Sequence, residues 1–546
     1  MGGNKVFVGL ASETGVRPVH GAIGAEQMAG TDRIMLRGWI AAGILLVATA
    51  VAQAEILPQQ VLVVYNAASA DGTALKNSYL AAHPGIPAAN VLALNNPGLL
   101  VGDVLYSTFV SSIRNPIRNH LSAPGDPTPE GIVAIVLIRP FPHRIFDTDL
   151  PQVGDVPANA ASEFDTGDAT FASVDSELTL LWQNLDAGEL GGTMDSKSDN
   201  VIDNPYHTLT AGIETFTRAN ITVAKIFDIR ANQCWLQPPG GGSQTLTPGD
   251  MYLVSRIDGR TLAQAQAVLT RAQNLLINKA KVRVLLDEYN LSVAGDLDDD
   301  FLFVANDPFK AGDDYEECRD LLTPQGWDVR YDASSNFISS AEETNDLIFF
   351  ASYGENHSLN GGGENPAGNG VYIDNYHFAP GAIFNTLESF NGRDFNSNGP
   401  AFLQEQAIDF LTAGGTFAVG NVWEPFTFSL PDNEFLALNF LVNGRTWGEA
   451  AWSAVPALSW QQLVVGDPIA RAAVVNDPGM PPGDLNGDGR VDGDDIRWFL
   501  LLINGGYDAY RTAFPSLDPY ARADFSLDRL FTTADSPTFI GLLLNP

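Results

Sequence analysis

Cysteine is nearly absent from this chain of 546 residues, which contains only Cys234 and Cys318. Two cysteines can form one bridge at most, so a disulfide framework is excluded. The motifs GxxxxGKS/T, GxGxxG, HExxH and GxSxG are also missing. The sequence therefore gives no support for nucleotide, dinucleotide, zinc-peptidase or serine-hydrolase chemistry.

Basic residues are few, with 30 Lys and Arg against 65 Asp and Glu and a formal net charge of -35. A polyanion repels nucleic acid and anionic lipid surfaces. We therefore expect neither of them as a partner.

Only one long apolar run is present, at residues 39–51, and Arg37 precedes it. The run is shorter than the roughly 20 residues that cross a bilayer, and the AQA motif at residues 52–54 fits a cleavage site. We predict a signal peptide at residues 35–54, with an uncleaved anchor as the alternative. Residues 1–34 would then be a spurious or disordered extension. The mature chain would be secreted, extracellular or on the cell surface, with no membrane span.

Near the C-terminus, the stretch DLNGDGRVDGDD at residues 484–495 has the ligand spacing of an EF-hand calcium loop. Gly489 stands at position 6, where such loops turn sharply, although position 12 is Asp instead of the usual Glu. Calcium is a hard cation that takes about six to eight oxygen ligands. A solvated acidic turn is the alternative. The predicted calcium ligands are Asp484, Asn486, Asp488, the Arg490 carbonyl, Asp492 and Asp495.

A second stretch, DFSLDRLFTTAD at residues 524–535, repeats this pattern with weaker ligands. Arg529 replaces the glycine of position 6, which predicts a strained or opened turn. An apolar helical pattern follows each loop, at residues 496–503 and 539–544. The predicted ligands of this second calcium site are Asp524, Ser526, Asp528, the Leu530 carbonyl, Thr532 and Asp535.

Two loop–helix units within residues 483–546 resemble the dockerin type I module. The resemblance implies a calcium-dependent docking domain that attaches an exported cargo to a cohesin-like domain or a cell-surface scaffold. In known dockerins, loop positions 10 and 11 help to choose the partner. Here these positions are Gly493-Asp494 and Thr533-Ala534. The two pairs differ, so no known cohesin specificity is assumed.

Residues 55–475 alternate short apolar runs with helical patterns, which predicts an α/β domain with a doubly wound, mostly parallel sheet and helices on both faces. Two β-α-β units, starting near residues 61 and 301, suggest subdomains at about 55–295 and 296–475. The predicted strands are at residues 61–65, 91–94, 132–138, 251–255, 301–305, 327–331, 347–351 and 416–420. The predicted helices are at residues 73–82, 173–182, 261–276, 315–322 and 402–412. The Gly- and Pro-rich stretch 188–249 is expected to be inserted loops, and residues 476–482 a linker.

Ligands gather at the carboxyl edge of open parallel sheets, and several predicted strands end in polar residues. Glu355, His357, Glu424 and Asp467 are the candidate catalytic residues among them. Capping and packing is the alternative for Asp467, because Asp often caps helices and turns.

Glu424 lies beside Trp423, and a carboxyl group in apolar surroundings can act as an acid with a raised pKa. A salt bridge from Glu424 to Arg256 or Arg445 is the other interpretation.

Several segments resemble a family of uncharacterised exported bacterial proteins, similar in strand order to gingipain- and caspase-like cysteine peptidases. They are SVDSELTLL at 173–181, YLVSRIDG at 252–259, SYGENH at 352–357, VGNVWEP at 419–425 and LSWQQLVVGDP at 458–468. In such peptidases a His follows one strand and a Cys follows the next. His357 matches the first position, but residues 421–424 contain no cysteine. Because a thiolate nucleophile needs a positioned His partner, we predict that the domain is not a cysteine peptidase.

These observations predict an exported protein with a non-catalytic binding or structural large domain. Its C-terminal module attaches it to a partner in a calcium-dependent manner. The alternative is a glycoside or peptide hydrolase that uses carboxylates at the strand ends. Dockerins often carry glycoside hydrolases, which act in polysaccharide breakdown with two carboxylates.

Overall fold

The computed structural model describes the chain from Ile56 to Leu544 with gaps. All of these residues belong to one compact unit, residues 53–546. Among them, no helix is both long and apolar enough to cross a membrane. The predicted signal peptide and the predicted strand at 301–305 lie outside the described residues. Those are 56–100, 102–125, 127–146, 172–182, 201–204, 206–210, 221–227, 243–246, 251–288, 315–334, 337–354, 373, 375–393, 395, 406–423, 425, 429–479 and 481–544.

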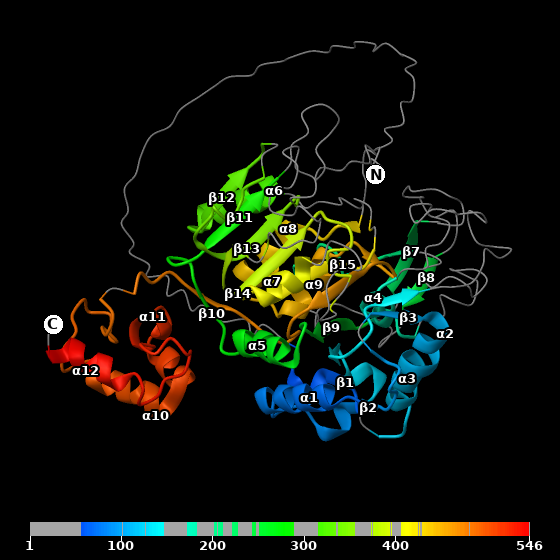
Figure 1. Cartoon of the computed structure of the whole chain (residues 1–546), viewed down its shortest axis with the longest axis horizontal. Helices are drawn as coiled ribbons and strands as arrows, with labels where there is room; N and C mark the ends of the chain where they lie inside the picture. Colours follow the sequence, from blue (N-terminus) through cyan, green and yellow to red (C-terminus); the bar gives the residue numbers. More distant parts are fainter. Residues whose placement is uncertain are drawn as a thin grey trace, which may run out of the picture. The chain divides into compact units, whose positions relative to one another are not determined.

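A ten-stranded, mostly parallel mixed sheet forms the centre of the large domain (Figure 1). Its order is β12-β11-β13-β14-β15-β17-β9-β4-β1-β2. Each half of the sheet is parallel within itself. One half comprises β11 (Arg283–Asp287), β12 (Asp328–Asp332), β13 (Asp346–Ser352), β14 (His377–Thr386) and β15 (Phe417–Asn421). The other comprises β17 (Gln462–Val465), β9 (Leu253–Ile257), β4 (Ala134–Ile138), β1 (Val61–Asn66) and β2 (Val91–Leu94).

The two halves run in opposite directions, because β15 and β17 pair antiparallel. Ala418 lies opposite Val465, and Asn421 lies opposite Gln462. The carboxyl ends of the two halves therefore lie at opposite edges of the sheet. An α/β domain with a mostly parallel sheet is confirmed, and one sheet contains strands from both predicted subdomains.

Continuous apolar sequence explains the central strands. All five residues of β4 and six of the seven residues of β13 are buried, as expected for strands covered on both faces. β14 was not predicted, because Pro380 and Gly381 interrupt its apolar run. The stretch 188–249, expected to be loop, contains the strands β6 (Val201–Asp203), β7 (Ile221–Phe227) and β8 (Ser243–Leu246), which form an antiparallel sheet with β16 (Ala457–Leu458).

Helices flank the sheet in groups that contact one another. α1 (Ala70–Ala82) packs on β1 and beside α5 (Leu262–Ala272), and α5 contacts α7 (Gln406–Thr412) (Figure 1). α8 (Asn433–Leu436) contacts both α6 (Tyr315–Leu322) and α9 (Trp447–Ala454). α4 (Val174–Thr179) lies against β9 and β17. α3 (Asn115–Leu121) contacts β2, and α2 (Tyr106–Phe109) precedes α3 in the chain.

The helix α5 begins where its sequence predicts and ends earlier. Thr261 and Gln264 form a reciprocal capping box at its start, which satisfies two of the amides that a helix leaves unpaired. The helix ends at Ala272, four residues before the predicted end. Leu276 instead begins β10 (Leu276–Asn278), which pairs with β18 (Ala473–Val475).

The C-terminal region is helical, with α10 (Ile496–Ala513), α11 (Pro519–Ala523) and α12 (Ser536–Leu544). α10 is kinked at Gly506, where φ is 75°. Phe499 and Phe539 stack with ring centroids 4.2 Å apart. Around this stack lies a small core of six buried residues: Leu485, Phe499, Leu502, Tyr510, Ala523 and Phe539.

Candidate functional sites

The first predicted calcium loop, residues 484–495, is closed by bonds from its own amides to the carboxylates at its two ends. Asp484 Oδ1 accepts the amides of Gly487 and Asp488 at 2.8 and 3.1 Å, and its Oδ2 accepts the amide of Gly489 at 2.9 Å. At the other end, Asp495 Oδ1 accepts the amides of Leu485 and Asn486, and its Oδ2 accepts the amide of Asp492. The loop is therefore a defined turn with both end carboxylates directed inward.

The second predicted loop, residues 524–535, repeats this bonding at equivalent positions. Asp524 accepts the amides of Asp528 and Arg529. Asp535 accepts the amides of Ser526 and Thr532 at 2.9 and 3.0 Å. The two loops thus share a turn geometry although their sequences differ at nine of twelve positions.

Both loops turn through left-handed residues at positions 4 and 6. In the first loop these are Gly487 (φ 74°) and Gly489 (φ 88°). In the second they are Leu527 (φ 59°) and Arg529 (φ 60°). Residues with a Cβ rarely adopt this conformation, so the second loop is strained, as its sequence predicts, and it is not opened.

The end carboxylates of both loops are buried and close enough to disfavour each other's charge. Burial raises the pKa of Asp495, and the charge of Asp484 adds to the rise. Burial likewise raises the pKa of Asp524, with a further contribution from Asp535. A cation between the two carboxylates of a loop would relieve this repulsion.

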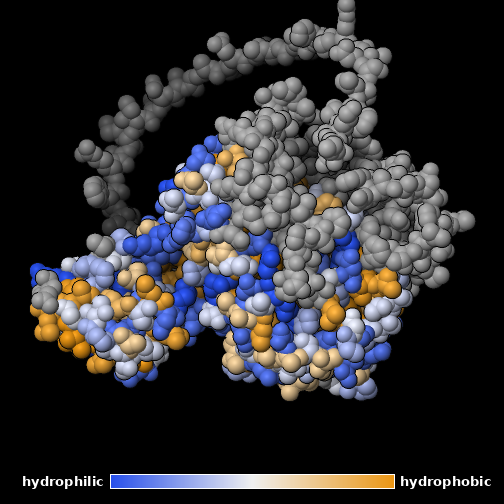
Figure 2. Space-filling view, in the orientation of Figure 1, coloured by the Kyte–Doolittle hydropathy of each residue, from blue (hydrophilic) through white to orange (hydrophobic). Residues whose placement is uncertain are grey.

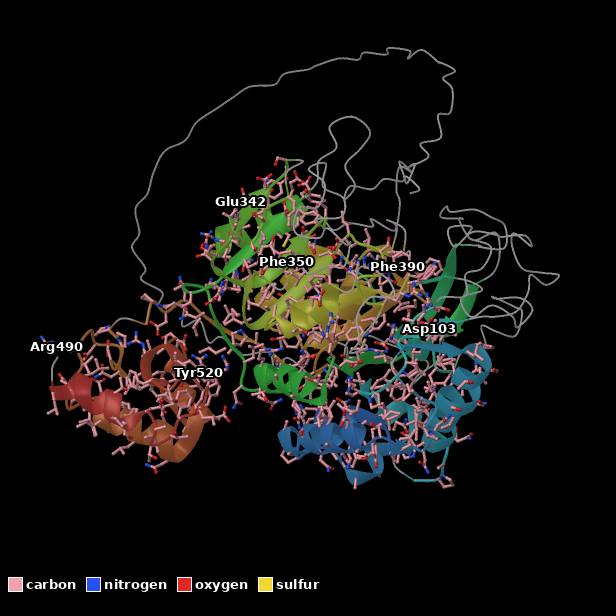
Figure 3. The ribbon with its side chains drawn as sticks, viewed as in Figure 1. Asp103, Glu342, Phe350, Phe390, Arg490 and Tyr520 are labelled. Carbon is pink, nitrogen blue, oxygen red and sulfur yellow. The ribbon has the colours of Figure 1, made fainter. Side chains whose placement is uncertain are left out.

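The donor set of each loop suits calcium, since both supply five oxygen side chains and a carbonyl. In the part of the chain that the structure describes, however, no three His, Cys, Asp or Glu side chains converge as metal ligands. In the first loop Asp488 and Asp492 are exposed, and Arg490 lies at the surface (Figure 3). Calcium would have to draw Asp488 and Asp492 inward to complete its shell.

The predicted catalytic residues Glu355, His357 and Glu424 lie outside the described residues. Their described neighbours, Gly354 and Trp423, follow the carboxyl ends of β13 and β15.

The carboxyl edge near β13 and β15 contains two buried acids that the sequence interpretation missed. Glu388, after β14, is fully buried against Gly354, and a side chain at Gly354 would overlap its carboxyl group. Asp287, at the end of β11, accepts the Ile338 amide at 2.9 Å, and burial raises its pKa well above the usual value. The sequence signal that could have indicated Asp287 was its position directly after an apolar run.

Trp423 at the same edge is surrounded by cationic and aromatic groups. The guanidinium groups of Arg144 and Arg393 lie 4.5 and 4.6 Å from its ring. Phe390, labelled in Figure 3, meets it edge-on at 4.7 Å. These contacts fit cation–π and aromatic packing of a buried ring.

Arg256 and Arg445, the predicted partners of Glu424, have partners of their own among the described residues. Arg256 is fully buried, with Nε 3.0 Å from Asp175 Oδ2 and Nη1 3.3 Å from Asp258 Oδ2. Arg445 donates to the carbonyl of Thr210. The contacts of Arg256 with Asp175 and Asp258 stabilise the centre of the large domain.

Asp467 lies at the opposite edge of the sheet from the ends of β13 and β15, because it follows β17. Its Oδ2 is 2.7 Å from His83 Nε2, and its Oδ1 accepts the Tyr79 hydroxyl at 3.1 Å. Asp467 is fully buried, and the His83 side chain is 13% exposed. The sequence did not predict this pairing, because 384 residues separate the two partners.

A cavity of about 670 Å³ opens beside this pair. His83, Asp467, Gln273, Arg471 and Tyr507 are among its lining residues. A buried carboxylate that holds one ring nitrogen of a histidine can orient that imidazole for proton transfer.

Cys318 is fully buried on α6. Cys234 lies outside the described residues.

Comparison with known proteins gives no family for this chain: no family model, curated protein or solved structure matches it.

Proposed function

We propose that the chain is an exported protein whose C-terminal region, residues 483–546, binds calcium and docks to a cohesin-like domain or a cell-surface scaffold. The observation that carries this proposal is the equivalent bonding of the two loops. In each, the carboxylates of positions 1 and 12 are buried and accept amides of the loop, and a helix follows. A cation is the natural partner for two buried carboxylates in one turn.

An apolar surface on the C-terminal helices supports docking. Ile496 and Leu500 on α10 are 43% and 51% exposed, and Ile540 and Leu544 on α12 are 52% and 74% exposed. Each pair is spaced i, i+4, so each lies on one side of its helix. Figure 2 shows hydrophobic colouring over this region. Exposed apolar surface of this kind is typical of protein-binding sites.

For the large domain we propose a binding or structural role on a peptidase-like fold, without cysteine-peptidase activity. The buried charges of Arg256 and Asp175 at its centre are paired as in a structural core. The cysteine Cys318 is buried within the helix α6 and does not directly follow a strand.

The alternative is a hydrolase, and one observation favours a specific version of it. His83 is held by Asp467 beside a cavity large enough for a small substrate. On this alternative His83 would be the general base. Hydrolysis of peptide and glycan substrates by the wild type and by His83→Asn tests it, and equal rates would exclude it.

The calcium proposal is tested by calorimetric titration of the full chain. We expect calcium binding at two sites, with Asp488→Ala weakening the first more than Ser526→Ala weakens the second, because a carboxylate is the stronger ligand. Absence of calcium binding, with identical thermal unfolding in calcium and in chelator, would refute the proposal.

The docking proposal is tested with a purified type I cohesin domain as the probe. Binding should require calcium and should weaken about tenfold or more in Leu500→Ser, since burying this side chain contributes about 2 kcal/mol. Leu57→Ser is the matched control, because Leu57 is 40% exposed in the large domain. Equal binding by both variants would place the docking surface elsewhere, and no binding at any calcium concentration would exclude this cohesin as the partner.

A further inference from the structure

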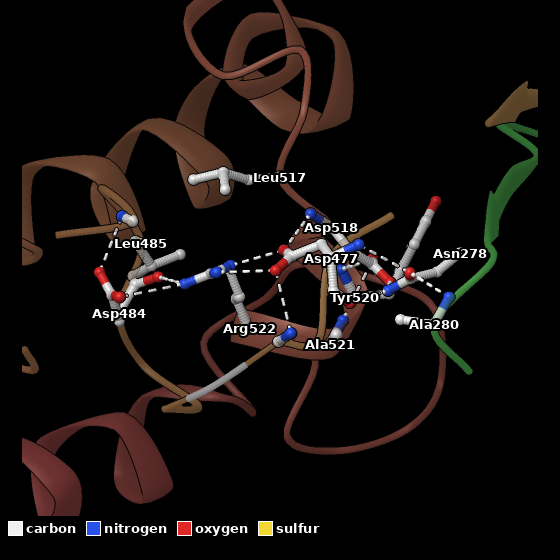
Figure 4. Close-up of polar contacts among 12 residues, drawn as sticks. Asn278, Ala280, Asp477, Asp484, Leu485, Leu517, Asp518, Tyr520, Ala521 and Arg522 are labelled. Atoms are coloured by element: carbon white, nitrogen blue, oxygen red, sulfur yellow. Dashed lines mark hydrogen bonds and ion pairs between the residues drawn. The ribbon is translucent and has the colours of Figure 1, made fainter. Parts of the chain in front are cut away.

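A buried ion-pair network centred on Arg522 joins the C-terminal region to the large domain (Figure 4). Arg522, on α11, is 4% exposed. Its Nε and Nη2 donate to the two carboxylate oxygens of Asp477 at 2.7 and 2.8 Å. Its Nη1 donates to the carbonyl of Asp484 and lies 3.3 Å from Asp484 Oδ2. One guanidinium group therefore contacts both the predicted linker and the first predicted calcium ligand.

Asp477 is committed to this role by four hydrogen bonds. Besides Arg522, its oxygens accept the amides of Gly479 and Asp518 at 2.9 and 2.8 Å. Burial raises the pKa of Asp477, but the bonds from Arg522 and the two amides outweigh it and hold that pKa at about 2. A bidentate pair of this kind is among the strongest interactions of a guanidinium group.

The large domain fixes the position of Asp477. Asn278, at the end of β10, accepts the Asp477 amide at 2.9 Å and donates to its carbonyl. The same amide group of Asn278 donates to Asp518 Oδ2 at 2.9 Å. Asp477 is thus anchored to both the sheet side and the C-terminal side of the junction.

Asp484 has little bonding capacity to spare. A carboxylate offers about four acceptor positions, and three loop amides use three of them. Arg522 Nη1 and a calcium ion would compete for the fourth. While Asp477 holds the guanidinium, the contact with Asp484 Oδ2 stays long, at 3.3 Å. A guanidinium released from Asp477 would turn to Asp484 and form a short ion pair.

We propose that Asp477 is a positioning residue for the first calcium site, because its hold on Arg522 keeps the Asp484 carboxylate available to the ion. This inference rests on the proposed calcium function. Asp477, which lies in the predicted linker, is then part of the support of the calcium site.

The test uses the full chain carrying Asp528→Ala, which removes an exposed ligand of the second loop so that titration with calcium reports the first. In this background, Asp477→Asn should weaken calcium binding about tenfold or more, because calcium must then break a charge-assisted bond from Arg522 to Asp484. Asp508→Asn is the matched control. It removes one exposed negative charge from the same region and should change the affinity less than about twofold.

The decisive variant is Asp477→Asn with Arg522→Gln, which removes the competing guanidinium. It should recover at least most of the lost affinity, whereas a merely structural role for Asp477 predicts no recovery. Arg522→Gln alone should bind calcium at least as tightly as the background. If Asp477→Asn fails to fold, the calcium affinity of Arg522→Gln tests the inference by itself. The inference is overturned if Asp477→Asn and Asp508→Asn bind calcium with equal affinity. It is also overturned if Arg522→Gln binds calcium more weakly than the background. If the Asp528→Ala background itself binds no calcium, the proposed function fails first, and the inference fails with it.

Discussion

The left-handed turns of the two loops predict opposite effects for two glycine exchanges. Leu527→Gly should stabilise the second loop, because Leu527 has a φ of 59° and glycine adopts this conformation without strain. Gly489→Ala should destabilise the first loop, because Gly489 has a φ of 88°. Both changes act on the backbone alone. Leu527 is 85% exposed, and nothing lies within 4 Å of a Cβ built on Gly489.

The magnitude follows from two opposing contributions. A left-handed residue with a Cβ costs about 1–2 kcal/mol, and a glycine loses about 0.5–1 kcal/mol more than alanine in backbone entropy on folding. The net effect is about 1 kcal/mol, favourable for Leu527→Gly and unfavourable for Gly489→Ala. Working in chelator removes any contribution from calcium.

Hydrogen exchange of the full chain, read by mass spectrometry over α10 and α12, measures this local stability. About 1 kcal/mol corresponds to a roughly fivefold change in exchange rate. Exchange in α12 should slow for Leu527→Gly, and exchange in α10 should accelerate for Gly489→Ala. Leu530→Gly is the control, since Leu530 is 59% exposed and lies outside the left-handed positions. The strain argument is refuted if Leu527→Gly and Leu530→Gly shift exchange in the same direction.

Three further predictions concern the large domain. Burial lowers the pKa of His207 from 6.5 to about 4, so the unfolded chain takes up a proton first as the pH falls, and stability is lost between about pH 6.5 and 4. The free energy of unfolding falls by about 3 kcal/mol over this range. Urea unfolding at pH 7 and 4.5 should show that His207→Gln lacks this fall, and a pH dependence equal to that of the wild type would contradict the assignment. Asp175→Ala should cost about 3 kcal/mol or more in the same assay, because it leaves Arg256 buried without its main partner, and a cost below about 1 kcal/mol would exclude a structural role for the pair. A thiol-reactive peptidase probe should not label Cys318 in the folded chain, since this side chain is fully buried; His357-dependent labelling of Cys318 or Cys234 would restore the peptidase hypothesis.

Local sequence was enough to predict residues 484–495 and 524–535 as turns. The bonds from loop amides to loop carboxylates join residues no more than ten positions apart, such as Asp484 with Gly489 and Asp495 with Leu485. Spacing therefore encodes the turn directly. The sequence also predicted the strain at Arg529, because this residue has a Cβ and occupies a left-handed position that favours glycine. Apolar runs likewise located strands such as β4 and β13, since a strand buried on both faces must be apolar throughout.

Tertiary structure alone decided which polar residues meet. The antiparallel pairing of β15 with β17 places Asp467 at the edge opposite the ends of β13 and β15, and it brings His83 to Asp467. Strand direction within a sheet is not written in the hydrophobic pattern, which is the same for either direction. The Arg522 junction has the same origin, because Asn278 and Asp477 are 199 residues apart and meet only when β10 pairs with β18. The sequence determined what each segment is, since that depends on neighbours along the chain, and the fold determined what each segment contacts, since that depends on how distant apolar surfaces pack together.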